Sequence, residues 1–322
     1  MMKHNTKYIL LASVLALVTA AGCQRYSLIP TGDAIKYEVS VEDIKAKGEL
    51  VNNNDDNYND IALAGTLSPF RVAAYNGTSP IFTTSGLDPA NVETVSYDGG
   101  WKMPNTYYWP QKTVLTFFAY GNLPEDDNTS VVISYTGLTL THEMVSAVAD
   151  QKDILLGYYD GLGSNSGTAE IRFWHPLTAV FFRDGGLGDT VKSISLSGLG
   201  KSGSVRMNAE GKIGAWTDVA AYTAESSQSD DAGLAVDADT KVIGEPFILI
   251  PQDLAAEGGH PVTLTVEFVS GLTLEATISS KDGWASQKTN YYTLSYGEPT
   301  GWKLTVTPWG VGASGDIRVT KN

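Results

Sequence analysis

The cysteine of this 322-residue chain, Cys23, follows directly on an apolar run, and its thiol is a candidate for covalent modification. Two lysines give the chain a basic start, residues 8–21 are mostly apolar, and small residues precede the cysteine, with Ala20 where a lipobox usually has leucine. The run is too short to cross roughly 30 Å of hydrocarbon. We therefore predict a lipoprotein signal peptide over residues 1–22, with lipid attached to Cys23. An ordinary signal peptide with an incidental cysteine is the alternative.

The acidic balance of the chain narrows its classes of partner. The 36 acidic and 22 basic residues give a formal net charge of −14, which becomes −16 once residues 1–22, with two lysines and no acid, are removed. Such a surface disfavours phosphate backbones, so nucleic acid is not expected as a partner. With Cys23 carrying lipid, the chain has neither a disulfide framework nor a thiolate metal site. A single lipid-modified end anchors a protein to a membrane surface without spanning the membrane.

The histidines and glycine-rich stretches do not form a catalytic pattern. His142, His175 and His260 lack the i, i+4 spacing of metal ligands, and His175, within an apolar stretch, is expected to be a hydrogen-bonded structural residue. Residues 198–203 contain Lys-Ser but not the Walker spacing, so a turn between strands is expected there. The sequence thus predicts a non-enzyme without cofactors. A secreted hydrolase would require a carboxylate pair or a Ser/His constellation.

Acidic stretches and tryptophans suggest two further kinds of site. Residues 52–60 and 126–128 offer oxygen ligands for calcium, but neither matches the EF-hand loop, so solvated loops are expected and metal binding is the alternative. The tryptophans could form a carbohydrate platform, but they are scattered, so core packing is expected for most of them. They are Trp101, Trp109, Trp174, Trp216, Trp284, Trp302 and Trp309.

Alternation of apolar and polar residues dominates the chain. Ile35, Tyr37, Val39 and Val41 alternate with polar residues, which places them on one face of a strand. Further strands are expected at residues 70–74, 113–120, 131–135, 169–174, 178–182, 193–196, 262–268, 272–278, 291–294, 304–306 and 317–319. Helical periodicity is nearly absent, with residues 141–149 as the best candidate. Many short strands separated by turn residues predict an all-β protein built from β-sandwiches.

A flexible stretch, residues 161–167, suggests where the chain divides. We predict a tether over residues 23–32, an N-terminal β-sandwich over 33–162 and a C-terminal one over 163–322. The Ser- and Asp-rich residues 225–232 are expected to form a surface loop within the second half.

Several motifs, in a common order, resemble the fimbrillin family. They are Tyr107–Pro110 (YYWP) with Leu115–Tyr120 (LTFFAY), Asp153–Leu156 (DILL) with Phe173–Val180 (FWHPLTAV), Ile250–Gln252 (IPQ), Trp284 with Tyr291–Leu294 (YYTL), and Val306–Trp309 (VTPW). The resemblance implies a subunit or accessory protein of type V pili, exported as a palmitoylated lipoprotein to the outer membrane and found at the cell surface or in the fimbrium. It also implies two transthyretin-like β-sandwich domains in tandem.

The resemblance further implies assembly by strand exchange. In the family, a trypsin-like protease cuts the loop after the first strand, and a strand of another pilus subunit fills the groove that the lost strand leaves. The candidate residues here are Ile35, Tyr37, Val39 and Val41 in the displaced strand, Lys45, Lys47 and Arg71 at the cut, and Leu304, Val306, Ile317 and Val319 in the donor strand.

The loop after the first strand departs from the family's stalk subunits, which typically offer an arginine there. This chain has lysines in that loop, and Arg71 lies within the next expected strand. An uncut, lipid-anchored chain would suit an accessory or anchor role. The alternative function is a non-polymerising surface lipoprotein that binds glycan or a host ligand, for which two or three coplanar exposed aromatic rings are expected.

Overall fold

The computed structural model describes residues 33–41, 67, 69–83, 91–110, 113–124, 128–162, 167–281, 283–296 and 304–309. Five predicted site residues lie outside these ranges, namely Cys23, Lys45, Lys47, Ile317 and Val319. No helix in the described ranges is long and apolar enough to cross a membrane.

The regular secondary structure of the described residues is almost entirely β-strand, which confirms the all-β prediction. The exceptions are a 3-10 turn, η1 (Val148–Asp150), and Leu67, which is helical. The strands are β1 (Lys36–Val41), β2 (Phe70–Asn76), β3 (Ser79–Pro80), β4 (Glu93–Tyr97), β5 (Trp101–Lys102), β6 (Val114–Gly121), β7 (Ser130–Ser134), β8 (Gly137–Glu143), β9 (Leu155–Leu162), β10 (Thr168–Trp174), β11 (Thr178–Asp184), β12 (Val191–Asn208), β13 (Thr217–Ser229), β14 (Phe247–Leu249), β15 (Val262–Phe268), β16 (Thr273–Ile278), β17 (Thr289–Tyr296) and β18 (Leu304–Trp309).

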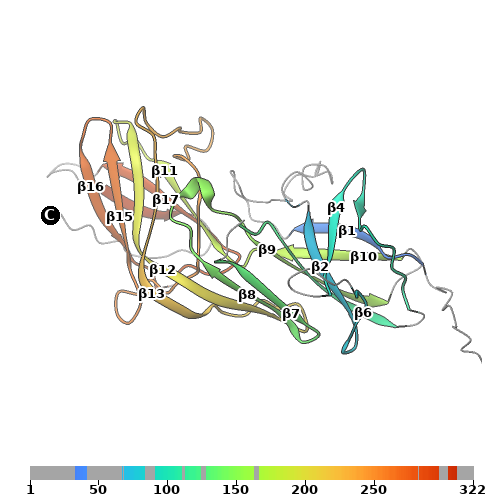
Figure 1. Ribbon diagram of the computed structural model, residues 1–322. Coiled ribbons are helices and arrows are strands. Elements are labelled where there is room, and N and C mark those ends of the chain that lie inside the picture. Colours follow the sequence, from blue (N-terminus) through green and yellow to red (C-terminus); the bar gives the residue numbers. More distant parts are fainter. Residues whose placement is uncertain are drawn as a thin grey trace, which may run out of the picture.

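An eight-stranded sheet occupies one end of the molecule (Figure 1). Its order is β1-β10-β9-β6-β2-β4-β5, with β3 paired to β2. The pairings within it are antiparallel except for that of β1 with β10, which is parallel. Parallel neighbours require a long connection, and β1 and β10 are indeed far apart in the sequence.

Two further sheets occupy the other end of the molecule (Figure 1). One has the order β16-β15-β12-β8-β7, with β13 also paired to β12, and the other has the order β14-β11-β17-β18. Inward side chains of both sheets, such as Ile194 and Leu264 from the first and Phe182 and Phe247 from the second, belong to one buried cluster. This is the sandwich arrangement that the short alternating strands predict.

Strand β6 is buried on both of its faces, as its apolar sequence predicts. Phe117 belongs to the core beside β1, whereas Phe118 belongs to the larger core shared with the other two sheets. The middle of the eight-stranded sheet is therefore covered on each side, which explains why its sequence does not alternate.

The stretch at residues 161–167 lies between two strands of the eight-stranded sheet in the sequence. It joins β9 to β10, which are antiparallel neighbours. The hairpin of β7 and β8 instead pairs with β12 in the six-stranded sheet. A division by sheets thus places β10 with the N-terminal strands and the β7–β8 hairpin with the C-terminal ones.

Three local predictions were wrong. Residues 141–149 do not form a helix, because the alternation of buried Leu138, Leu140 and His142 continues along β8, and only η1 follows. Residues 198–203 are not a turn, because they continue β12 past a bulge at Gly198, where φ is +85°. Residues 225–229 are not a loop but the end of β13, paired with β12.

Candidate functional site

Strand β1 lies at an edge of the eight-stranded sheet, where it is shown in blue beside β10 in Figure 1. Its parallel register runs from Lys36 opposite Thr168 to Val41 opposite Phe173. In the sheet order, β10 is the strand that β1 covers. Without β1, the backbone groups that β10 turns toward it would have no partner in this sheet.

The inward side chains of β1, together with Ile35 directly before it, are part of a buried core. Ile35, Tyr37, Val39 and Val41 are each between 3% and 8% exposed. Their cluster also contains aromatic residues of β2, β6 and β10, which are Phe70, Phe117 and Phe173. The structure thus places the four residues that alternation predicts on one face, and that face is buried.

Tyr37 connects β1 to a polar cluster in the interior. Its ring packs edge-on against Phe70 and Phe117, at centroid distances of 6.2 and 6.3 Å. Its hydroxyl donates to Met103 Sδ at 3.1 Å. Burial raises the pKa of Tyr37 well above its ordinary value, and the nearby Glu93 and Tyr107 raise it further. Tyr37 is therefore held as a neutral donor.

Glu93 is a buried carboxylate close to this strand. It is 1% exposed and accepts hydrogen bonds from Tyr107 Oη and from Asn105 Nδ2. Only Tyr107 lies in a motif that the sequence analysis singled out. Glu93 and Met103 carry no pattern of their own, and their role emerges only when β4 and the residues after β5 fold against β1.

Backbone contacts clamp the start of β1. Ile35 N donates to Tyr107 O at 2.8 Å, and Trp109 N donates to Asp33 O at 3.0 Å. Gly167 O accepts from Lys36 N at 2.8 Å and from Trp109 Nε1 at 2.7 Å. Gly167 has φ of +68°, and a Cβ there would lie 2.6 Å from Ala34 O. The close approach of these two segments of the backbone therefore requires glycine.

The candidate cleavage residues have different surroundings. Arg71 lies inside β2, where it is opposite Thr94 of β4 and Tyr120 of β6, so its backbone is paired on both sides. Lys45 and Lys47 lie outside the described residues, in the connection between β1 and β2. A protease needs an accessible, extended segment, which a strand in the middle of a sheet does not offer.

The two candidate donor segments also differ. Leu304 and Val306 belong to β18, which pairs antiparallel with β17 and places Val306 opposite Leu294. β18 is thus an edge strand of its own four-stranded sheet. Ile317 and Val319 lie outside the described residues.

His175 is a structural residue, as its sequence context predicts. It is 1% exposed, and its Nδ1 lies 2.9 Å from Asp153 Oδ1 and 2.8 Å from Asp153 Oδ2. Within the described ranges, its Nε2 has no hydrogen-bond partner. The histidine and its partner are 22 residues apart, so the sequence alone does not reveal the pair. No group of three or more potential metal ligands occurs in the part of the chain that the structure describes.

The five tryptophans whose side chains the structure describes do not form an exposed platform. Trp101, Trp109 and Trp284 are buried, and Trp174 and Trp216 are half-buried. Trp216 lines a hollow of about 570 Å³ together with Asp253 and Lys281. Its Nε1 donates to Pro176 O at 2.8 Å, so the indole is fixed to the protein backbone.

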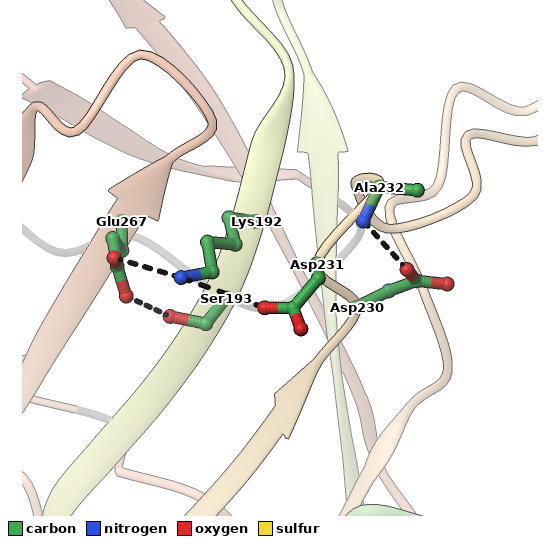
Figure 2. Close-up of polar contacts among 6 residues, drawn as sticks. All are labelled: Lys192, Ser193, Asp230, Asp231, Ala232 and Glu267. Carbon is green, nitrogen blue, oxygen red and sulfur yellow. Dashed lines mark hydrogen bonds and ion pairs between the residues drawn. The ribbon is translucent and has the colours of Figure 1, made fainter.

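A surface network of charges links β12 to its neighbours (Figure 2). Lys192 Nζ lies 3.3 Å from Glu267 Oε1 on β15 and 3.6 Å from Asp231 Oδ1 after β13. Ser193 Oγ donates to Glu267 Oε2, and Ala232 N donates to Asp230 Oδ1. The hydrogen bond to Glu267 and the two acidic charges raise the pKa of Lys192. These groups bond to one another at the surface and connect neighbouring strands, and each exposed ion pair contributes little to stability.

Comparison with known proteins gives the chain its relatives. A family model described as fimbrillin-like matches residues 64–309. A candidate cell adhesion protein from Bacteroides ovatus is 16% identical, with a TM-score of 0.54, over 89% of this chain and 98% of its own. Another from Bacteroides uniformis is 15% identical, with a TM-score of 0.51, over 86% and 97%. These two share the fold of this chain.

A more distant solved structure is the fimbrial anchor protein Mfa2 from Porphyromonas gingivalis. It is 12% identical, with a TM-score of 0.39, over 90% of this chain and 100% of its own. No curated protein matches the chain.

Proposed function

The chain belongs to the fimbrillin-like family, and from that premise we propose that it is a structural and adhesive component of type V fimbriae that assembles by protease-triggered strand donation. Membership supports a fimbrial or adhesive role at the cell surface. The observation that carries the finer proposal is the position of β1, an edge strand that buries three side chains, with a fourth from Ile35 directly before it, and whose neighbour β10 would lose its partner.

The energetics of β1 suit an exchange between strands. Burying an apolar side chain contributes roughly 1.5–3 kcal/mol, and each backbone hydrogen bond adds about 1 kcal/mol net. A strand from another subunit with the same alternation would recover both contributions. Once the chain is cut behind β1, a joint between subunits would therefore hold without a covalent bond.

Lys45 and Lys47 are the proposed cleavage sites. Both lie in the connection between β1 and β2, whereas Arg71 is held within β2 between two neighbouring strands. A trypsin-like protease is the proposed processing partner, because lysine is one of the two residues after which such enzymes cut. A chain that escapes this cut would serve as an accessory or anchor subunit.

The remaining parts of the proposal concern location and architecture. We place the chain at the outer membrane, attached through a lipid on Cys23, with its sandwiches as two transthyretin-like domains in tandem and other pilus subunits as its partners. We assign it a structural role and not a catalytic one. The family and the packing of β1 support this assignment.

Limited trypsin digestion tests the proposal. A mature chain with Cys23→Ser would be digested, weighed by intact mass spectrometry and imaged by electron microscopy. We expect loss of one N-terminal piece ending at Lys45 or Lys47, followed by ladders or filaments. The matched control, Lys45→Gln with Lys47→Gln, should stay intact and monomeric. A chain that loses this piece and remains monomeric would contradict strand donation.

A further inference from the structure

The outward face of β1 has a charge pattern at odds with its neighbour. Because β1 and β10 are parallel, residues in register turn their side chains to the same side, with backbones about 4.8 Å apart. Lys36, Glu38 and Ser40 lie opposite Thr168, Glu170 and Arg172 in that order, and Glu38 and Glu170 are both exposed. Two like charges therefore stand side by side, which destabilises this strand pair.

Lys36 and Arg172 lie two residues away in the same outward rows, but among the described residues neither forms an ion pair with these two carboxylates. In the part of the chain that the structure describes, neither Glu38 nor Glu170 forms an ion pair or side-chain hydrogen bond. The pKa of Tyr159 on β9 is raised by burial, and in addition by Glu170 and Asp160. Asp160 on β9 thus adds a third carboxylate near this edge.

We propose that Glu170 is a specificity-determining residue that selects, in the place of β1, a strand carrying a basic side chain at the position of Glu38. This inference rests on the proposed strand donation and deepens it. The apolar inward face and the backbone clamp hold β1, whereas its outward face repels β10 at this point. A donor that replaces repulsion with attraction would displace β1 more readily.

The occupant that fits is the segment Asp316–Lys321 of a second copy of this chain. Its sequence, DIRVTK, alternates Ile317 and Val319 with Arg318 between them. With Ile317 in the place of Tyr37 and Val319 in the place of Val39, Arg318 comes to lie beside Glu170. Thr320 then stands beside Arg172, where Ser40 stands now, and Lys321 takes the place of Val41 at the end of the strand.

The charges also select among the possible registers of this segment. A shift of two residues in one direction puts Asp316 beside Glu170 and Arg318 beside Arg172, so like charges meet twice. A shift of two residues in the other direction puts Arg318 beside Thr168, which carries no charge. Only the register with Arg318 beside Glu170 has an attractive pair.

The other candidate segment lacks this complementarity. With Leu304 and Val306 facing inward, Thr305 stands between them, so no charge is offered to Glu170. Leu304 and Val306 also belong to β18, which already pairs with β17 of its own chain. The charge pattern of the sequence therefore favours residues 316–321 as the donor.

Peptide binding to a mature chain whose β1 has been released tests this assignment. A recognition sequence for a site-specific protease, placed in residues 42–47 of the Cys23→Ser chain, allows β1 to be removed whether or not Lys45 or Lys47 is cut naturally. Fluorescence anisotropy then measures the affinity of a labelled peptide of residues 314–322. A peptide of residues 33–41 is the positive control, because it restores β1 itself.

We expect the 314–322 peptide to bind about threefold to tenfold more tightly than its Arg318→Glu version, in line with the size of cross-strand charge pairs. The chain variant Glu170→Arg should reverse this preference, and the matched variant Glu275→Lys on β16 should leave it unchanged. The preference should also shrink in high salt, because both charges are exposed. An Ile317→Tyr peptide should bind more tightly still, since it reaches Met103 as Tyr37 does.

The outcomes separate the two proposals. Equal binding of the 314–322 peptide and its Arg318→Glu version would overturn selection by Glu170 and leave strand donation standing. Binding of the 33–41 peptide without the 314–322 peptide would overturn the donor assignment alone. Failure of both peptides to bind would mean that the edge of β10 cannot be refilled, which would overturn the proposed function as well.

Discussion

Gly167 illustrates how far the place of β1 depends on a single residue. Its backbone oxygen accepts two hydrogen bonds, and its missing side chain lets Ala34 pass close by. A glycine in a loop of glycines and serines carries no distinguishing sequence signal. Its role follows from φ of +68° and from the neighbouring strand, both of which belong to the folded state.

Gly167→Ala is predicted to loosen β1. A non-glycine residue at positive φ costs about 1–2 kcal/mol, and here the added Cβ also collides with Ala34 O. Compared with the unchanged chain, the variant should exchange its amide hydrogens faster in residues 33–41, whereas the exchange rate in β15 should stay the same. Gly188→Ala is the matched control, because Gly188 has φ of +73° with nothing within 4 Å of the added Cβ. Equal effects of the two substitutions on β1 would refute the role of the close approach.

Asp153→Ala is predicted to destabilise the fold near η1. His175 would remain buried with neither ring nitrogen bonded by a side chain that this structure shows, and a buried polar group left without a partner costs about 1–3 kcal/mol. Denaturant unfolding should show a lower midpoint. Asp150→Ala removes an exposed carboxylate three residues away and should leave the midpoint nearly unchanged. Comparable midpoints for both variants would contradict a structural role for the His175–Asp153 pair.

Tyr292 allows a pH-dependent test of packing in the larger core, which the two sheets at the other end of the molecule share. Its hydroxyl accepts a hydrogen bond from Trp284 Nε1, and burial raises its pKa to about 12. The neutral form is thus favoured in the folded chain, and this contribution is complete below pH 10 and is lost as the pH rises to about 12. A shift of this size corresponds to a contribution on the order of 2 kcal/mol.

The variant Tyr292→Phe is therefore predicted to lose less stability than the unchanged chain between pH 10 and pH 12. Denaturant midpoints measured at both pH values provide the comparison. If both chains lose the same stability over this interval, the neutral, buried state of Tyr292 is refuted.

At the scale of elements, strands with one buried face were the most predictable. β15 begins and ends where the alternation of VTLTVEF does, and β1 and β2 were found by the same signal. Of the long strands β12 and β13, only residues 193–196 of β12 were predicted, because β13 is mostly exposed and its sequence resembles a loop. Their pairing supplies the backbone hydrogen bonds that the composition of β13 does not indicate.

The same distinction applies to the candidate site. The inward residues of β1 follow from period-2 spacing, but the parallel pairing with β10 does not, because register depends on strands more than 120 residues away. Glu93, Met103 and Gly167 were not predictable for that reason. The resemblance to the fimbrillin family predicts that the first strand is important, and the fold shows which residues pack against this strand.

Val39→Asp is predicted to detach β1 from its sheet while leaving the larger core intact. A carboxylate at this buried position would have no partner, so the strand would leave the sheet to reach water. Hydrogen exchange should rise in β1 and β10 and stay unchanged in β15. Ser40→Asp is the control on the other face, where it meets Arg172 and should protect β1. Exchange that rises across the whole chain would contradict a separable β1.

At the scale of the whole molecule, the buried side chains form two separate cores. The smaller core holds β1, whereas the larger core joins the other two sheets and one face of the first. Loss of β1 removes side chains from the smaller core alone. The molecule is therefore built so that one strand can leave without the larger core losing a side chain.

Trapping β1 in its sheet tests strand donation most directly. Ser40 and Arg172 are in register on neighbouring strands, about 4.8 Å apart, which lies within the range for a disulfide. Ser40→Cys with Arg172→Cys, in a Cys23→Ser chain, keeps Glu38 and Glu170 and locks β1 to β10. After cleavage behind β1, we predict that the oxidised chain stays monomeric and that reductant releases β1 and starts polymer formation. Polymers that form while the disulfide is intact would contradict strand donation at this site.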